Sequence, residues 1–112
     1  MAQLANANDS GLEALIALLK DDASDVRYRA AESLVQLGTA NDTVLEALIA
    51  LLKDDASAVR YRAAASLVQL GTANDSVLEA LIALPKDDDS YVRYLAAASL
   101  VQLGTANDSV LE

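Results

Sequence analysis

Apolar side chains recur along this chain at helical spacing. Within residues 44–53, Leu45, Leu48, Ile49 and Leu52 follow one another at steps of three, one and three, so they share one face of a helix. This pattern predicts an amphipathic helix over the segment. The same spacing occurs earlier and later in the chain.

A second helix is predicted over residues 57–70. Its apolar side chains Val59, Ala63 and Leu67 face one way, and Gly71 is placed to end the helix in a left-handed C-cap. A short Asp-Asp-x-Ser stretch separates the two helices and leaves room only for a tight turn. The two helices are therefore expected to pack antiparallel as a hairpin.

Polar residues mark the start of each first helix. Thr43 and Glu46 form a Ser/Thr-x-x-Glu capping box, which predicts Thr43 as the cap, and equivalent boxes recur in register. Matches to Asn-x-Ser/Thr lie beside these boxes, at Asn8, Asn41, Asn74 and Asn107. Because each match falls on a predicted cap, a capping role is favoured over glycosylation.

The helix pair is repeated along the chain. Gly38, Gly71 and Gly104 stand 33 residues apart, and residues 36–68 share 28 of 33 positions with residues 69–101. The preceding copy is nearly as similar. Identity this high indicates either recent duplication or deliberate construction, and the sequence leaves both open.

These repeats predict an all-α fold in which antiparallel helix pairs stack into a solenoid with a period of 33 residues. The chain of 112 residues is expected to form a single repeat domain, residues 1–112. Its repeats are predicted at about 3–38, 39–71 and 72–104, with 105–112 as the start of a truncated fourth.

Residues 59–71 read Val-Arg-Tyr-Arg-Ala-Ala-Ala-Ser-Leu-Val-Gln-Leu-Gly and follow Leu-Leu-Lys-Asp-Asp. This segment resembles the HEAT-like repeats often called phycobilisome-lyase type, and the resemblance covers nearly the whole chain. It is specific in the Asp-x(4)-Arg spacing, as from Asp55 to Arg60, and in the Ala-Ala-x-x-Leu-x-x-Leu-Gly ending. The resemblance implies a right-handed solenoid whose second helices line the concave face.

Acidic and guanidinium side chains recur at the turn of every repeat. The residues of this ladder are Asp22, Arg27, Asp55, Arg60, Asp88 and Arg93. One Asp at the turn and one Arg in the first turn of the second helix can hydrogen-bond within or between repeats. We expect the ladder to tie the turns down rather than to perform catalysis. Asp87, Asp88 and Asp89 lack the glycine and the loop length of a calcium site.

The copies differ mainly along one outward face of the second helix, where invariant Tyr and Gln residues also lie. Exposed aromatic and apolar side chains with polar tips are common in protein interfaces. The predicted partner-binding residues are Tyr28, Arg29, Tyr61, Arg62, Tyr91, Tyr94, Leu95, Gln36, Gln69 and Gln102. The alternative is that this surface simply tolerates change and that each Tyr ring packs along the neighbouring repeat.

Composition removes most enzyme classes. The chain has no Cys and no His, which excludes disulfides, thiolate nucleophiles, imidazole bases and the usual zinc or haem ligands, so no metal or cofactor is predicted. A net charge of −9 repels nucleic acid and anionic membrane surfaces. No apolar run exceeds six residues, so no membrane span is predicted and a cytoplasmic location is expected.

These observations favour a non-enzymatic protein–protein interaction scaffold that uses the concave face of the second helices to bind a protein or peptide. The alternative is a structural repeat module that self-assembles through uncapped ends, by end-to-end stacking or helix swapping. Resemblance adds a minor third possibility, a bilin lyase-like chaperone, in which Arg29 and Arg62 would pair with propionates. The iron-dependent hydroxylases of the family need His ligands, which are absent, and its DNA glycosylases need a basic groove.

Two local departures from the repeat carry further predictions. Pro85 replaces the apolar Leu19 and Leu52, and the missing N–H predicts a kinked or shortened first helix in the third copy. Pro85 also favours natural drift over an idealised design. Residues 3–13 match residues 36–46, which predicts that the chain begins with the end of a second helix.

Overall fold

The computed structural model describes residues 2–38, 40–70 and 75–104. Within these ranges the chain forms only helices, which confirms the all-α prediction. The elements are α1 (Ala2–Leu18), α2 (Ser24–Leu37), α3 (Asp42–Leu51), α4 (Ser57–Gln69), α5 (Asp75–Ala83), the 3₁₀ helix η1 (Leu84–Lys86) and α6 (Ser90–Gly104). None of these helices is both long enough and apolar enough to cross a membrane.

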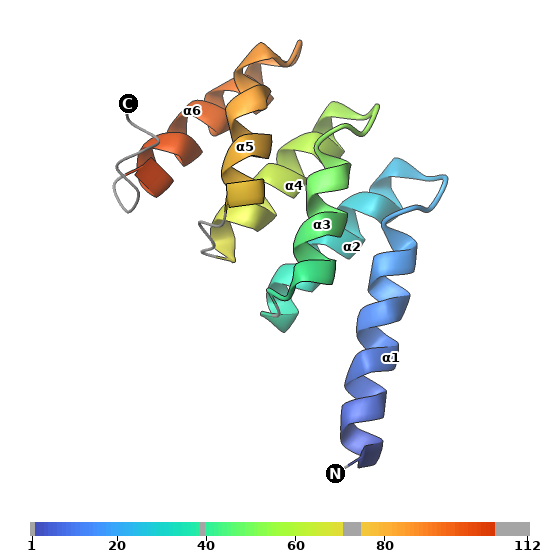
Figure 1. Cartoon of the computed structure of the whole chain (residues 1–112). Coiled ribbons are helices and arrows are strands. Elements are labelled where there is room, and N and C mark those ends of the chain that lie inside the picture. The colour runs from blue at the N-terminus through green and yellow to red at the C-terminus, as the bar shows by residue number, and fades with distance from the viewer. Residues whose placement is uncertain (1, 39, 71–74, 105–112) are drawn as a thin grey trace.

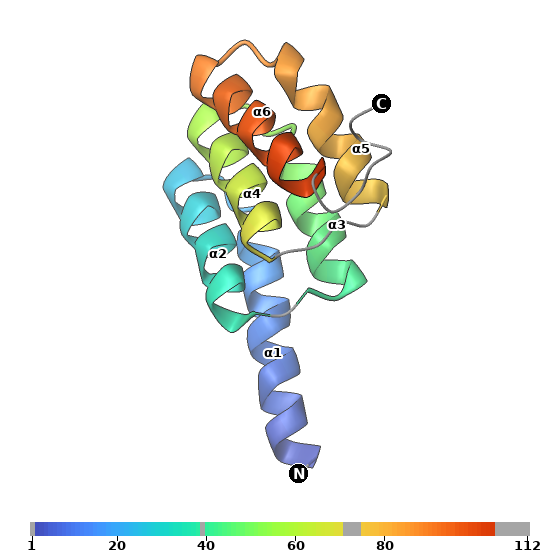
Figure 2. The ribbon, with the colours of Figure 1, turned by 90° about the vertical axis from the view of Figure 1, so that its left-hand side faces the viewer.

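The helices form two layers in an elongated stack. In Figures 1 and 2, α1, α3 and α5 follow one another in one layer, and α2, α4 and α6 follow one another in the second. Within the second layer, α2 packs on α4 and α4 packs on α6, while each helix also packs on its partner in the first layer. The molecule measures 47 × 31 × 17 Å, as expected when helix pairs are added along one direction.

The core runs between the two layers. Leu34, Leu48, Leu67 and Leu81 are fully buried and come from four successive helices, α2 to α5. Burial of a Leu side chain stabilises the fold by about 2 kcal/mol. Since equivalent positions are buried from one helix pair to the next, the core is continuous along the stack.

Gly38 ends α2 in the way the sequence predicted. Its φ angle is +71°, in the left-handed region, and its N–H donates to the Val35 carbonyl oxygen at 2.9 Å. A side chain with a Cβ atom would be strained at this φ angle. Gly71, for which the same role was predicted, lies outside the described residues.

The predicted cap of α3 was wrong by two residues. Asn41 is the N-cap, and its side-chain oxygen accepts a hydrogen bond from the Val44 N–H at 2.9 Å. Thr43 lies inside the first turn, because the helix already begins at Asp42. Asn41 therefore has the capping role inferred for the Asn-x-Thr match.

The first helix also differs from the expected arrangement. Residues 2–18 form one continuous helix, α1, instead of the end of one helix followed by the start of another. Ala5 stands where Gly38 ends α2, and Ala favours the helix over a left-handed turn. As a result, the first half of α1 projects beyond the stacked helices in Figures 1 and 2.

Pro85 shortens the first helix of the third pair, as predicted. The α-helix α5 ends at Ala83, one repeat position earlier than α3, and Pro85 lies in η1. The equivalent Leu52 N–H donates to the Ile49 carbonyl oxygen at 3.0 Å, a bond that proline cannot make. Leu52 is buried, whereas Pro85 is exposed.

Candidate partner-binding site

Arginine–aspartate pairs join each helix pair to the next. Arg27 Nε lies 2.7 Å from Asp54 Oδ2, and its Nη2 lies 2.9 Å from Asp54 Oδ1. Arg60 binds Asp87 through the same two atoms at the same distances. In both pairs the Arg side chain is 12% exposed and the Asp side chain 9% exposed. These bidentate, largely buried contacts fix the spacing between successive pairs.

The same arginines also hold their own turns. Arg60 Nη1 donates to the Asp54 carbonyl oxygen at 2.7 Å, and Arg93 Nη1 donates to the Asp87 carbonyl oxygen at 2.7 Å. Arg27 Nη1 likewise donates to the carbonyl oxygens of Asp21 and Asp22, at 2.7 and 3.0 Å. Each guanidinium is therefore oriented by its own turn before it meets a neighbouring repeat.

The sequence identified the arginines of the ladder but not their principal partners. Asp55 and Asp88 receive only one contact each, at 3.3 and 3.0 Å from Nη2 of Arg27 and Arg60, and both are exposed. The main acceptors are the first carboxylates of the Asp-Asp pairs, Asp54 and Asp87, which sequence reasoning missed. The signal was available, because the first Asp is also unchanged in all three copies.

A local turn positions each of these missed carboxylates. Asp54 Oδ1 accepts the Ala56 N–H at 2.9 Å, and Asp87 Oδ1 accepts the Asp89 N–H at 2.9 Å. An aspartate that accepts a backbone N–H two residues later stabilises a tight turn. The carboxylate is thereby held ready for the incoming guanidinium.

These contacts shift the pKa values of the paired groups. Hydrogen bonds from Arg60 hold the pKa of Asp87 below its usual value. Burial raises the pKa of Asp54, but the hydrogen bonds from Arg27 and Ala56 outweigh it, so the net pKa is lowered. The hydrogen bond to Asp87 raises the pKa of Arg60. All four groups of the two pairs therefore stay charged at neutral pH.

Three tyrosines from three helices line a groove across the second layer. Tyr28 of α2, Tyr61 of α4 and Tyr91 of α6 surround a space of about 300 Å³. The remaining lining residues are Ser57, Ala58 and Asp89. The groove lies at the starts of α4 and α6, and Tyr91 stands at its rim with 73% of its surface exposed.

Tyr28 also takes part in packing between repeats. Arg62 Nη2 donates to the Tyr28 hydroxyl oxygen at 3.1 Å, and the guanidinium carbon lies 5.0 Å from the centre of the Tyr28 ring. Tyr28 and Tyr61 are half-buried and pack against the hydrophobic core. The packing alternative thus describes Tyr28, while Tyr91 is left for contact with another molecule.

The other predicted partner-binding residues lie apart from this groove. Tyr94, 74% exposed, does not line it, although it is only three residues from Tyr91. Arg29 pairs with Glu32 at 3.4 Å, and Leu95 packs against the core. Exposed glutamines occupy the last turns of α2, α4 and α6, away from the groove lining, at Gln36, Gln69 and Gln102.

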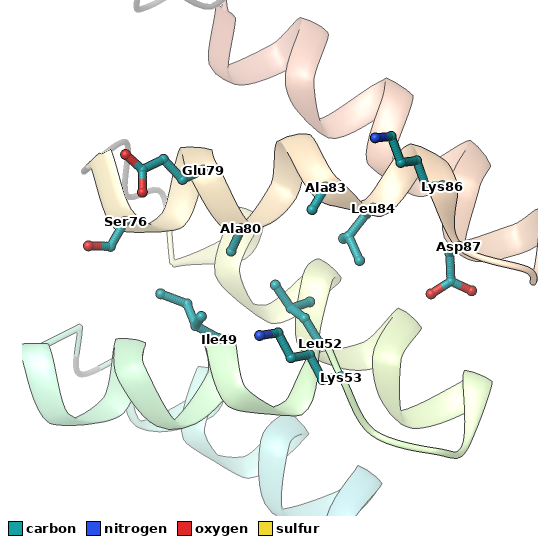
Figure 3. Close-up of a pocket in the computed structure, with 10 residues that line it drawn as sticks. All are labelled: Ile49, Leu52, Lys53, Ser76, Glu79, Ala80, Ala83, Leu84, Lys86 and Asp87. Atoms are coloured by element: carbon teal, nitrogen blue, oxygen red, sulfur yellow. The ribbon is translucent and has the colours of Figure 1, made fainter.

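A second groove lies in the other layer, between α3 and α5 (Figure 3). It has a volume of about 500 Å³ and an apolar floor that includes Ile49, Leu52 and Leu84. Charged side chains, among them Lys53 and Lys86, lie at its edge (Figure 3). Sequence analysis did not single out this groove.

Comparison with known proteins establishes the family. The family model described as HEAT repeats matches residues 2–68 and again residues 45–111. The chain belongs to the HEAT repeat family. The resemblance stated from the sequence is thereby confirmed, and HEAT repeats imply a solenoid of helix pairs, which agrees with the two layers seen here.

A solved structure of an engineered protein, from the Northeast Structural Genomics Consortium, is similar to this HEAT repeat chain. It has 33% sequence identity and a TM-score of 0.69, and the match covers 88% of this chain and 48% of the other. The chain thus spans about half the length of that structure. Among curated proteins, none matches the sequence significantly.

Proposed function

We propose that this HEAT repeat domain is a non-enzymatic scaffold that binds a protein or peptide segment across α2, α4 and α6. The observation that carries the proposal is the groove to which Tyr28, Tyr61 and Tyr91 each contribute from a different helix. Tyrosine offers a rigid apolar ring and a hydroxyl group, a combination enriched in protein interfaces. An extended segment crossing the three helices would meet one ring from each.

The charge around the groove favours a neutral or basic segment. Asp89 lines the groove, none of the described lining residues is basic, and the whole chain carries a net charge of −9. The contact between Arg62 and Tyr28 provides a model for how a guanidinium group would meet a tyrosine ring here. We therefore expect Lys or Arg side chains in the bound segment.

The groove residues are suited to recognition rather than to chemistry. Asp89 is committed to the start of α6, where its Oδ1 accepts the N–H groups of Tyr91 at 2.9 Å and Val92 at 3.1 Å. Ser57 has no imidazole base to activate it, since the chain contains no His. Among the described residues, no three His, Cys, Asp or Glu side chains are grouped to hold a metal ion.

The bilin-binding alternative is not favoured by this arrangement. It would use Arg29 and Arg62 together, but Arg62 is engaged by Tyr28 and Arg29 by Glu32. We therefore carry only the protein-binding proposal forward.

The experiment is selection of a displayed peptide library on the immobilised chain, followed by calorimetric titration of the selected peptides. Tyr91→Ala should weaken binding at least tenfold, since an exposed interface tyrosine is a typical hot spot. Tyr61→Ala should do the same, with circular dichroism to show that the helices are intact. Lys53→Ala, in the opposite layer, is the matched control and should leave the affinity unchanged. Equal affinity for the chain and Tyr91→Ala would contradict the proposal.

A further inference from the structure

The two ends of the helix stack carry opposite halves of the interface that joins the repeats internally. We infer that the chain associates head to tail with a second copy of itself, α5, η1 and α6 of one copy packing on α1 and α2 of the next. The inference goes beyond the proposed peptide-binding function and uses different residues.

The internal contacts between repeats follow a fixed offset along the sequence. Arg27 meets Asp54 and Arg60 meets Asp87, both 27 residues later. Arg62 contacts Tyr28 at an offset of 34 residues. These contacts define what a following repeat must present to the one before it.

The first repeat presents the same groups that the third repeat would need. The residue that would answer Arg93 corresponds, three periods of 33 residues earlier, to Asp21, and the contact made by Asp55 and Asp88 corresponds to Asp22. In the same way, Arg29 corresponds to the partner of Tyr94. A second copy would therefore supply both the carboxylates and the guanidinium group that the internal interfaces use.

A serine completes the match. Ser66 Oγ donates to the Ala31 carbonyl oxygen at 3.5 Å across the first internal interface. The equivalent groups at the two ends are Ser33 of the incoming copy and the carbonyl oxygen of Ala97. Four kinds of contact thus recur with the residue types unchanged.

Exposure distinguishes the end groups from their internal equivalents. Arg93 is exposed, while Arg27 and Arg60 are only 12% exposed. Tyr94 is 74% exposed, whereas Tyr28 and Tyr61 are half-buried. The C-terminal face of the described structure therefore shows surface that a following repeat covers elsewhere.

The opposite end shows the complementary change. The Arg29 side chain is 82% exposed, whereas Arg62 at the equivalent position is half-buried against Tyr28. Leu18 is exposed, although Leu51 and Leu84 at the same repeat position are buried. Apolar residues are exposed at both ends, at Leu18 and Leu37 on one and at Ile82 and Val101 on the other.

Charge and symmetry determine the form of the assembly. Arg93 is cationic and Asp21 and Asp22 are anionic, so the two faces are complementary to each other and not to themselves. A contact between two different faces generates an open chain of copies instead of a closed dimer. We expect molar mass to increase continuously with concentration.

The test is sedimentation equilibrium of the full chain from micromolar to millimolar concentration. The expected result is a mass that rises from 11.7 kDa towards and beyond twice that value. Arg93→Glu and Asp21→Arg should each raise the concentration needed for association at least tenfold, because each places like charges opposite one another. Lys53→Glu, a charge reversal away from both ends, is the matched control and should associate like the unaltered chain.

Mixing the two charge-reversed chains decides whether the contact is the one inferred. Glu at position 93 of one chain would face Arg at position 21 of the other, so the mixture should regain the lost association. A mass that stays at 11.7 kDa throughout, or a mixture that fails to regain association, would overturn the inference. Circular dichroism of each variant checks that the helices are retained.

Discussion

Arg60 joins two helix pairs because its guanidinium group has donors for both. Nη1 binds its own turn at the Asp54 carbonyl oxygen, while Nε and Nη2 bind the Asp87 carboxylate of the next pair. Arg93 makes the first of these contacts, to the Asp87 carbonyl oxygen. The two arginines therefore allow the contact within a repeat to be separated from the contact between repeats.

Arg60→Ala should lower the free energy of unfolding by about 3 kcal/mol, because it leaves the Asp87 carboxylate largely buried without its partner. Arg93→Ala should cost less than about 1 kcal/mol, since it removes a contact to one carbonyl oxygen at an exposed site. Urea denaturation followed by circular dichroism at low micromolar concentration measures both. Equal losses for the two variants would show that the contact between repeats adds nothing.

Acid should weaken the same joints. The pKa values of Asp54 and Asp87 are lowered in the folded chain, so their contribution is fully present above the unfolded value of about 3.9 and is lost as the pH falls through the lower folded values. Asp87→Asn should therefore reduce the loss of stability between about pH 5 and pH 2. Glu46→Gln, at an exposed position of α3, serves as the control. A slope unchanged by Asp87→Asn would contradict the assignment.

At this scale the sequence could predict residue types more easily than partners. Both aspartates of each Asp-Asp pair lie near the arginine, and only the turn geometry places Asp54 and Asp87 in the bidentate position. The tyrosine groove was also beyond the repeat pattern, because Tyr91 is equivalent to Ala58 and not to Tyr61. Packing of α6 on α4 brings Tyr91 beside Tyr61, and spacing within one helix cannot show this.

Whole elements follow the hydrophobic pattern closely, and the exceptions have local causes. The segments predicted as helices at 44–53 and 57–70 correspond to α3 and α4, with ends that differ by one or two residues. The boundaries fail where a single residue changes the turn, as when Ala5 lets α1 continue. Periodicity identifies the buried face, while caps and glycines decide where a helix stops.

Pro85→Leu should change stability by less than about 1 kcal/mol. The substitution restores one backbone donor, but η1 already ends the helix and the site is exposed. A urea titration against the unaltered chain measures the difference at low concentration. A gain or loss of several kcal/mol would mean that Pro85 strains or supports the end of α5.

The whole molecule is a stack in which every joint repeats the one before it. Layers, core and helix-pair order follow from the repeated hydrophobic pattern, because one helix pair cannot bury its apolar face alone. The right-handed sense and the concave placement of the second helices stay predictions from the family resemblance. The tyrosine groove, in contrast, depends on how far successive pairs are displaced along the stack.

The most direct test of the proposed function is to locate the bound peptide by NMR. Amide shifts of the ¹⁵N-labelled chain would be followed during titration with a peptide selected from the library. The account predicts the largest changes at the starts of α4 and α6, around Ser57, Tyr61 and Tyr91. Changes gathered instead along the groove between α3 and α5, around Ile49 and Lys53, would contradict it.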